Sequence, residues 1–163
     1  MLNPHVQNQS VTIKVDVINI NLSPIGFHYY ASQFLAAARS VERSSQFSPV
    51  PFYLYCRALE LCFKAYLLVK GVPKNELKRR CLGHNLESVL ARAEALGLTS
   101  IVQLNNVERQ QLTKANAYYA DKGFEYFFVM RAITGYRDLP DLAILDQLAS
   151  KLVECLEATC LAA

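Results

Sequence analysis

Apolar residues recur at helical spacing along most of the chain. The segment 27–45 carries a single apolar stripe, which is typical of a helix that packs with one face against a core. The segment 52–70 is apolar over most of its circumference, so we expect it to be a helix at the centre of a bundle. Gly71 and Pro73 mark its end, because glycine favours the C-cap and proline cannot continue a helix.

Further helices are predicted in the second half of the chain. A short basic helical segment covers residues 75–80, and Asn85 is a candidate N-cap for a helix that Gly97 ends. A weaker and more polar helix is expected over 101–119. After Pro140, a long final helix carries leucines at helical spacing toward the core.

Two segments have the pattern of extended chain instead. Residues 11–17 alternate apolar and polar side chains, as a half-buried strand does. Residues 124–134 are rich in aromatic and β-branched side chains, and we expect them to be extended and to pair with the N-terminal strand. The sequence leaves open whether that pairing is within one chain or across a dimer. Ser23-Pro24 separates the strand from the helices.

The predicted fold is mainly α: a bundle of four to six helices with a minor β element. We expect one domain over residues 1–163, with a polar lead and strand at 1–23 and the bundle at 27–161, because a chain of 163 residues can bury one core. No apolar run has the roughly 18–20 residues that cross a bilayer, so no membrane association is expected. The polar N-terminus is unlike a signal peptide, and five cysteines without regular spacing indicate reduced thiols and a cytoplasmic protein.

The most apolar helix also carries a family motif. Residues 55–68 read Tyr-Cys-Arg-Ala-Leu-Glu-Leu-Cys-Phe-Lys-Ala-Tyr-Leu-Leu, a glycine follows, and then comes Gly83-His84-Asn85-Leu86. This pattern resembles the second and third helices of the HEPN superfamily (higher-eukaryote and prokaryote nucleotide-binding domains). In many HEPN domains a Glu-Leu-x-x-Lys-Ala helix precedes a Gly/Thr-His-Asp-Leu turn. Here Asn85 stands where Asp is more usual, and the resemblance spans roughly residues 27–156.

The resemblance implies a bundle of four or five helices that is commonly dimeric. Active HEPN proteins are metal-independent RNases, often toxins or antiviral effectors. Others are non-catalytic partners of nucleotidyltransferases, or modules that bind nucleotides or RNA. The nucleases carry an Arg-x(4–6)-His motif at the start of the last helix, doubled across a dimer. The corresponding segment here begins at Arg137, and no histidine follows it, so the chain departs from the nuclease pattern.

One pair of residues preserves the spacing of that motif elsewhere. RNA cleavage without a metal needs a base for the 2′-hydroxyl proton and a cation for the phosphorane oxygens, and histidine and arginine suit these roles. Arg79 precedes His84 by the required distance, but both lie before the third helix. A metal-independent RNase that uses this pair is therefore the alternative function. The structural interpretation is that His84 fixes the loop at the helix start, as is common in the family.

Two groups of charges are candidate nucleotide or phosphate contacts. Arg57, Glu60 and Lys64 share one helix face at spacings of three and four, where Glu60 can pair with both cations. This triad is either an ion-paired stripe that orients the bundle or the lining of a cleft that presents a cation to a phosphate. Lys78 and Arg80, on either side of the candidate catalytic arginine, are either solvated surface or phosphate contacts.

The preferred hypothesis is a non-catalytic HEPN-like module that binds a nucleotide, RNA or a protein partner. It would act as a homodimer, or with a nucleotidyltransferase or antitoxin-type partner in a toxin–antitoxin or defence system. A purely structural helical homodimer is a third hypothesis. The aromatic residues between 118 and 136 favour core packing or a dimer surface over base stacking, since few basic residues interleave them. No spacing of Cys and His indicates a metal site, and no cofactor is expected.

Overall fold

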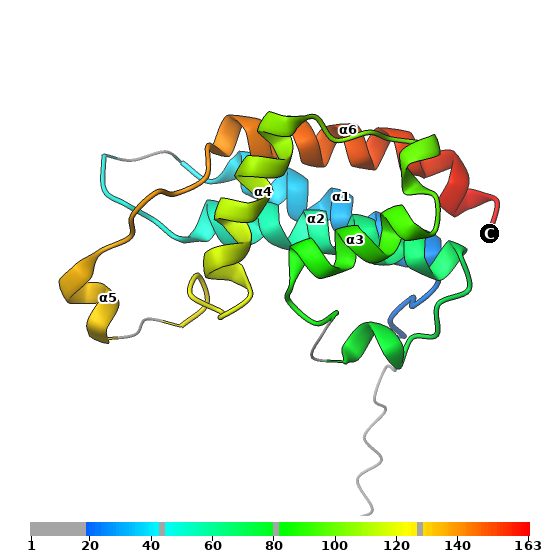
Figure 1. Cartoon of the computed structure of the whole chain (residues 1–163), viewed down its shortest axis with the longest axis horizontal. Helices are drawn as coiled ribbons and strands as arrows, with labels where there is room; N and C mark the ends of the chain where they lie inside the picture. The colour runs from blue at the N-terminus through cyan, green and yellow to red at the C-terminus, as the bar shows by residue number, and fades with distance from the viewer. Residues whose placement is uncertain (1–18, 43–44, 80–81, 127–128) are drawn as a thin grey trace, which may run out of the picture.

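The computed structural model describes residues 19–42, 45–79, 82–126 and 129–163 (Figure 1). Within these ranges all regular structure is helical, and no residue lies in a strand. The elements in chain order are α1 (Pro24–Ser40), α2 (Val50–Val69), η1 (Glu76–Lys78), α3 (Leu86–Ala95), η2 (Leu98–Ser100), α4 (Asn106–Tyr119), α5 (Val129–Thr134) and α6 (Leu142–Leu161). The mainly α fold is therefore confirmed, whereas the predicted strand over 11–17 lies outside the described ranges.

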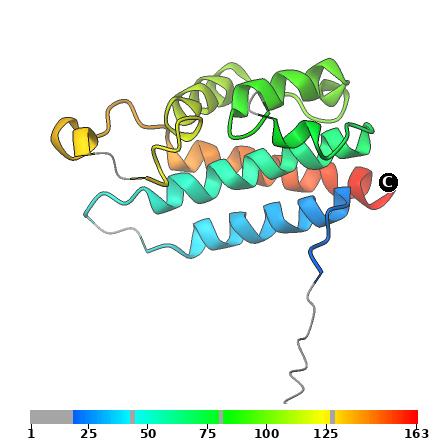
Figure 2. The same ribbon diagram turned by 90° about the horizontal axis from the view of Figure 1, so that it is seen from below.

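Helix α2 is the central element of the bundle. It packs most extensively against α1 and also contacts α6, α3 and α4, so almost every side chain from Tyr55 to Leu67 is buried. Figure 2 shows α1 and α2 running antiparallel, with α6 alongside them and α3 and α4 on the opposite side from α1. This position explains the sequence pattern, since a helix that is covered on all sides needs apolar residues on all sides.

The ends of the helices follow their capping residues. Ser23 is the N-cap of α1, since its hydroxyl accepts a hydrogen bond from the Gly26 N–H (3.3 Å). Pro24 occupies the first helical position, so α1 begins three residues earlier than predicted. Asn85 caps α3, with its side-chain oxygen 2.9 Å from the Ser88 nitrogen, as predicted. Asn105 is the N-cap of α4 and forms a capping box with Glu108. Helix α4 therefore begins at Asn106, after η2, and not at residue 101 as predicted.

The prediction that residues 124–134 are extended is wrong for the part of this range that the structure describes, 124–126 and 129–134. Residues 129–134 form the short helix α5, and Phe124 to Tyr126 lie in turns. The turn begins at Lys122, whose backbone has a positive φ of 57° and whose carbonyl accepts from the Glu125 and Tyr126 N–H groups at 3.0 and 2.9 Å. Phe124 is buried and stacks on Phe52 at 5.5 Å, so core packing overrides the β-propensity at this residue, whereas Val129 and Ile133 of α5 are exposed.

Side-chain clamps tie the outer helices to one another. Arg39 of α1 forms a bidentate ion pair with Asp146 of α6, in which Nε donates to Oδ1 at 2.7 Å and Nη2 donates to Oδ2 at 3.1 Å. The Tyr55 hydroxyl of α2 donates to the same carboxylate at 3.2 Å, so three helices meet at this group. The buried ring of His28 lies 2.8 Å from the Val153 carbonyl of α6.

Among the described helices, none has a stretch that is apolar and long enough to cross a bilayer.

Candidate functional site

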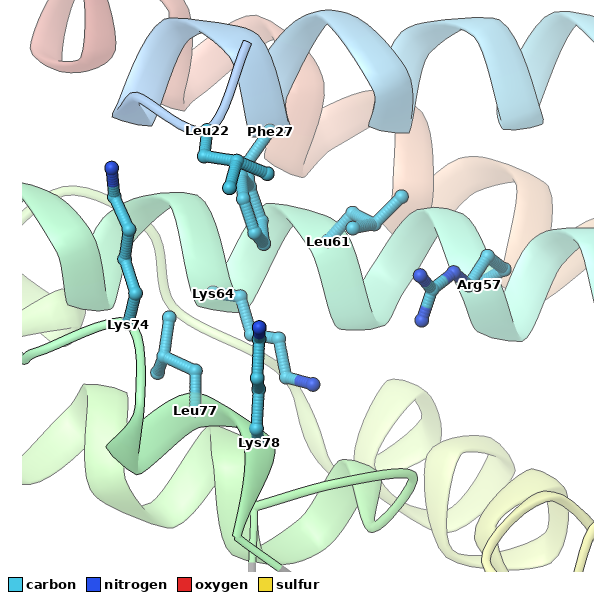
Figure 3. A pocket seen from close by; sticks show the side chains of 8 residues that line it. All are labelled: Leu22, Phe27, Arg57, Leu61, Lys64, Lys74, Leu77 and Lys78. Carbon is cyan, nitrogen blue, oxygen red and sulfur yellow. The ribbon is translucent and has the colours of Figure 1, made fainter. Parts of the chain in front are cut away.

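A pocket of about 170 Å³ opens between the start of α1, the middle of α2 and the η1 segment (Figure 3). Its polar lining consists of cations, and its remaining lining is apolar. We call it the cationic pocket, lined by Arg57, Lys64, Lys74, Lys78, Leu22, Phe27, Leu61 and Leu77. No carboxylate is among these described lining residues. The structure thus brings together Arg57, Lys64 and Lys78, three of the residues singled out as phosphate contacts.

Helix periodicity and a tight turn build two sides of the pocket. Arg57, Leu61 and Lys64 lie three and four residues apart, so they share one face of α2. Gly71 then adopts a positive φ of 78°, and the Val72 N–H donates to the Leu67 carbonyl at 3.0 Å, which turns the chain back. Buried Leu77 packs η1 against the bundle. Lys74, which precedes η1, and Lys78, which ends it, line the pocket.

The third side of the pocket depends on a close turn before α1. The Asn21 N–H donates to the Tyr30 hydroxyl at 2.9 Å, and the Asn21 side chain accepts from the Ser23 N–H at 3.0 Å. Gly26 lies directly against this turn, and a Cβ at that position would overlap the Asn21 carbonyl oxygen. The turn places Leu22 beside Phe27 at the pocket (Figure 3).

A buried carboxylate lies behind the pocket and binds two of its cations. The Glu60 side chain has no exposed surface; Arg57 Nη1 donates to Oε2 at 3.0 Å, and Lys64 Nζ donates to Oε1. The Tyr119 hydroxyl of α4 donates to Oε2, and His84 Nδ1 lies 3.3 Å from the same oxygen. We call these five residues the Glu60 centre. It joins α2 to α4 and to the loop before α3.

The Glu60 centre keeps its carboxyl ionised. Burial disfavours the charged form, but His84, Lys64 and Arg57 outweigh burial and lower the pKa of Glu60 to about 2. Burial and the neighbouring carboxylate raise the pKa of Tyr119, so its hydroxyl stays a donor. The Glu60 carboxylate therefore faces Arg57 and Lys64, and the ion pairs within the triad, predicted from its spacing, are confirmed.

His84 faces this centre and not the pocket. Its Nδ1 is buried and lies within ion-pair distance of the Glu60 carboxylate. Its ring meets the Tyr119 ring edge-on at 5.5 Å. Arg79 is exposed just after η1. Neither residue is among the described lining of the cationic pocket, and Arg80 lies outside the described ranges.

The loop that holds His84 is fixed by polar groups from other elements. Lys64 Nζ donates to the Gly83 carbonyl at 2.9 Å, and the Leu86 N–H donates to the buried Asn116 side chain at 2.8 Å. The Asn116 amide in turn donates to Glu87 at 2.9 Å. Lys64 therefore has two roles, since it pairs with Glu60 and holds the start of α3.

Comparisons with protein-family models, curated proteins and solved structures gave no match. No group of three or more His, Cys, Asp or Glu side chains in the described ranges is placed to hold a metal ion. The arrangement offers hydrogen-bond donors and positive charge, which suit an anionic ligand.

Two participants in the site were not predicted from the sequence. Lys74 lines the pocket, and Tyr119 donates to Glu60 across 59 residues of chain. Lys74 lies in the turn before η1, outside the predicted helical segment 75–80, so helical spacing did not point to it. No sequence pattern predicted the contact of Tyr119 with Glu60, because local residue spacing does not show which residues of distant helices come together.

Proposed function

We propose that this chain is a non-catalytic, HEPN-like module that binds a phosphate group of RNA or of a nucleotide in the cationic pocket. The observation that carries the proposal is the gathering of Arg57, Lys64, Lys74 and Lys78 around one pocket, with no carboxylate among its described lining. Phosphate contacts from lysine and arginine dominate the affinity of most nucleic-acid binders.

The four cations retain the capacity to bind an anion. No described carboxylate is ion-paired with Lys74 or Lys78, although ion pairs are present elsewhere in the bundle. Lys64 has three donors, of which Glu60 and the Gly83 carbonyl take two. Arg57 has five N–H donors, and its guanidinium keeps donors beyond the one that Glu60 accepts.

The position of His84 favours binding over cleavage. A general base must reach the 2′-hydroxyl of the RNA that it deprotonates. His84 Nδ1 is buried against Glu60, whereas the pocket that suits the phosphate is lined by other residues. An RNase that uses Arg79 and His84 would need its phosphate at a different place from the cationic pocket.

RNA binding by fluorescence anisotropy tests the proposal. We expect saturable binding of labelled RNA by the wild type, and a loss of about tenfold in affinity when Lys74→Gln and Lys78→Gln are combined. The matched control combines Lys70→Gln with Lys122→Gln, two exposed lysines outside the pocket, and lowers the net charge equally. Equal losses in both variants, or no binding by the wild type, would contradict the proposal.

RNA integrity on a denaturing gel, in EDTA, tests the absence of catalysis. We expect wild type and His84→Ala to leave a mixed pool of tRNA and mRNA intact. Cleavage by the wild type that His84→Ala abolishes would instead establish the RNase. Saturable binding in the anisotropy assay would exclude a purely structural dimer.

A further inference from the structure

We infer that the cationic pocket takes a terminal phosphate, a phosphomonoester at the end of an RNA or on a nucleotide, and that it does not read the base. This inference rests on the proposed function and narrows its ligand. It follows from three properties of the pocket: the hydrogen-bonding character of its lining, its volume, and the directions from which its side chains come.

Every polar side chain among the described lining residues is a hydrogen-bond donor. Lysine and arginine side chains donate hydrogen bonds and accept none, and they make up all of the described polar lining. A nucleobase edge or a sugar hydroxyl presents donors of its own, which would be left without acceptors in such a pocket. A dianionic phosphomonoester presents terminal oxygens that are all acceptors, and it carries about two negative charges at neutral pH. A phosphodiester carries one charge and two free oxygens, so it uses fewer of the donors.

The volume fits a phosphate and not a whole nucleotide. The pocket measures about 170 Å³, below the roughly 300–1,000 Å³ of pockets that enclose a drug-sized ligand. A phosphate group fits within it, while an attached nucleoside must extend outside. The base would then lie beyond the donors of the pocket, so its identity would contribute little to affinity.

The lining side chains come from three directions. Figure 3 shows Leu22 and Phe27 entering from the α1 side, Leu61 from α2, and Lys74 and Lys78 from the segment below. A phosphodiester inside RNA is attached to the chain through two ester oxygens, so the chain must leave the pocket in two directions. A terminal phosphate is attached through one ester oxygen and needs only one opening. The apolar walls also reduce the water around a bound anion, which strengthens each charge-assisted hydrogen bond.

The test compares one short RNA sequence in three forms: with a 5′-phosphate, with a 3′-phosphate, and with hydroxyls at both ends. We expect either phosphorylated form to bind wild type about tenfold more tightly than the hydroxyl form, as an added charged hydrogen-bonding group allows. The Lys74→Gln/Lys78→Gln variant should lose this preference, and the Lys70→Gln/Lys122→Gln control should keep it. A second sequence of the same length should give the same ratios.

Each outcome separates this inference from the proposed function. If all three forms bind equally, the terminal-phosphate inference is overturned while phosphate-backbone binding stands. If no form binds, both fall. If the preference for a terminal phosphate survives in the Lys74→Gln/Lys78→Gln variant, the terminal phosphate is bound outside the pocket, and the inference is overturned.

Competition between inorganic phosphate and sulfate adds a readout of ligand charge. The second ionisation of inorganic phosphate lies close to neutral pH, somewhat above that of a phosphomonoester, whereas sulfate is a dianion throughout the working range. We expect phosphate to lose potency as a competitor relative to sulfate between about pH 7.5 and about pH 5.5, as phosphate gains a proton. A constant ratio across this range would show that the pocket does not select the dianion, and would overturn the inference.

Discussion

Replacing Glu60 by glutamine should change both the stability of the protein and its dependence on pH. The carboxyl is fully buried, and its pKa is lowered from 4.5 to about 2, so ionised Glu60 stabilises the folded state. A shift of this size corresponds to about 3 kcal/mol at neutral pH, at 1.36 kcal/mol per pKa unit. Glutamine keeps the shape of the side chain but leaves Arg57 and Lys64 without their counter-charge. We therefore expect Glu60→Gln to lower the free energy of unfolding at pH 7 by about 3 kcal/mol.

The sign of the pH dependence follows from the direction of the shift. Because the folded-state pKa is lowered, the stabilisation is fully present above the unfolded value of 4.5 and is lost as pH falls toward about 2. Urea unfolding followed by circular dichroism at several pH values gives the free energy of each protein. The other carboxyl groups are common to both proteins and cancel in the difference. The difference between wild type and Glu60→Gln should shrink by about 2 kcal/mol between pH 7 and pH 3. A difference that stays constant over this range would show that the negative charge of Glu60 does not stabilise the folded state.

Three further substitutions test other parts of the bundle by the same urea assay. Arg39→Ala removes the ion pair with Asp146, which is partly exposed, and should cost about 0.5–1 kcal/mol, with a smaller loss in high salt; a salt-independent loss would contradict an electrostatic origin. Asn85→Ala removes the α3 cap on the Ser88 N–H and should cost about 1 kcal/mol, whereas an unchanged midpoint would show that the cap adds nothing. Leu152→Ala opens a cavity at a fully buried position and should cost about 2–5 kcal/mol. A loss below 1 kcal/mol would mean that the core around this leucine repacks.

Local sequence features predicted the parts of the fold that depend on local physics. Gly71 and Gly97 end helices with positive φ values of 78° and 92°, and Asn85 caps α3. The pairing of Glu60 with its helix neighbours also followed from spacing alone. Helix α5 was missed because the β-branched composition of that segment favours strands, and the exposed side chains of Val129 and Ile133 show that core packing does not explain its helical form.

The pocket itself was only half predictable. Arg57 and Lys64 share a helix face, and this follows from residue numbers. Their approach to Lys74 and Lys78 depends on the turn after α2, whose direction no local pattern specifies. Long-range packing therefore decides which predicted cations share a site.

The contact between Gly26 and Asn21 determines the shape of the pocket wall although Gly26 is not itself among the described lining residues. Any side chain at residue 26 must push the preceding turn outward, because a Cβ would overlap the Asn21 carbonyl. Leu22 belongs to that turn and to the pocket wall. If the proposed phosphate binding holds, a genetic screen for its loss would therefore recover changes at residue 26 beside those in the lysines. Such a mutant would keep every charge of the site while its pocket wall and the turn before α1 are displaced.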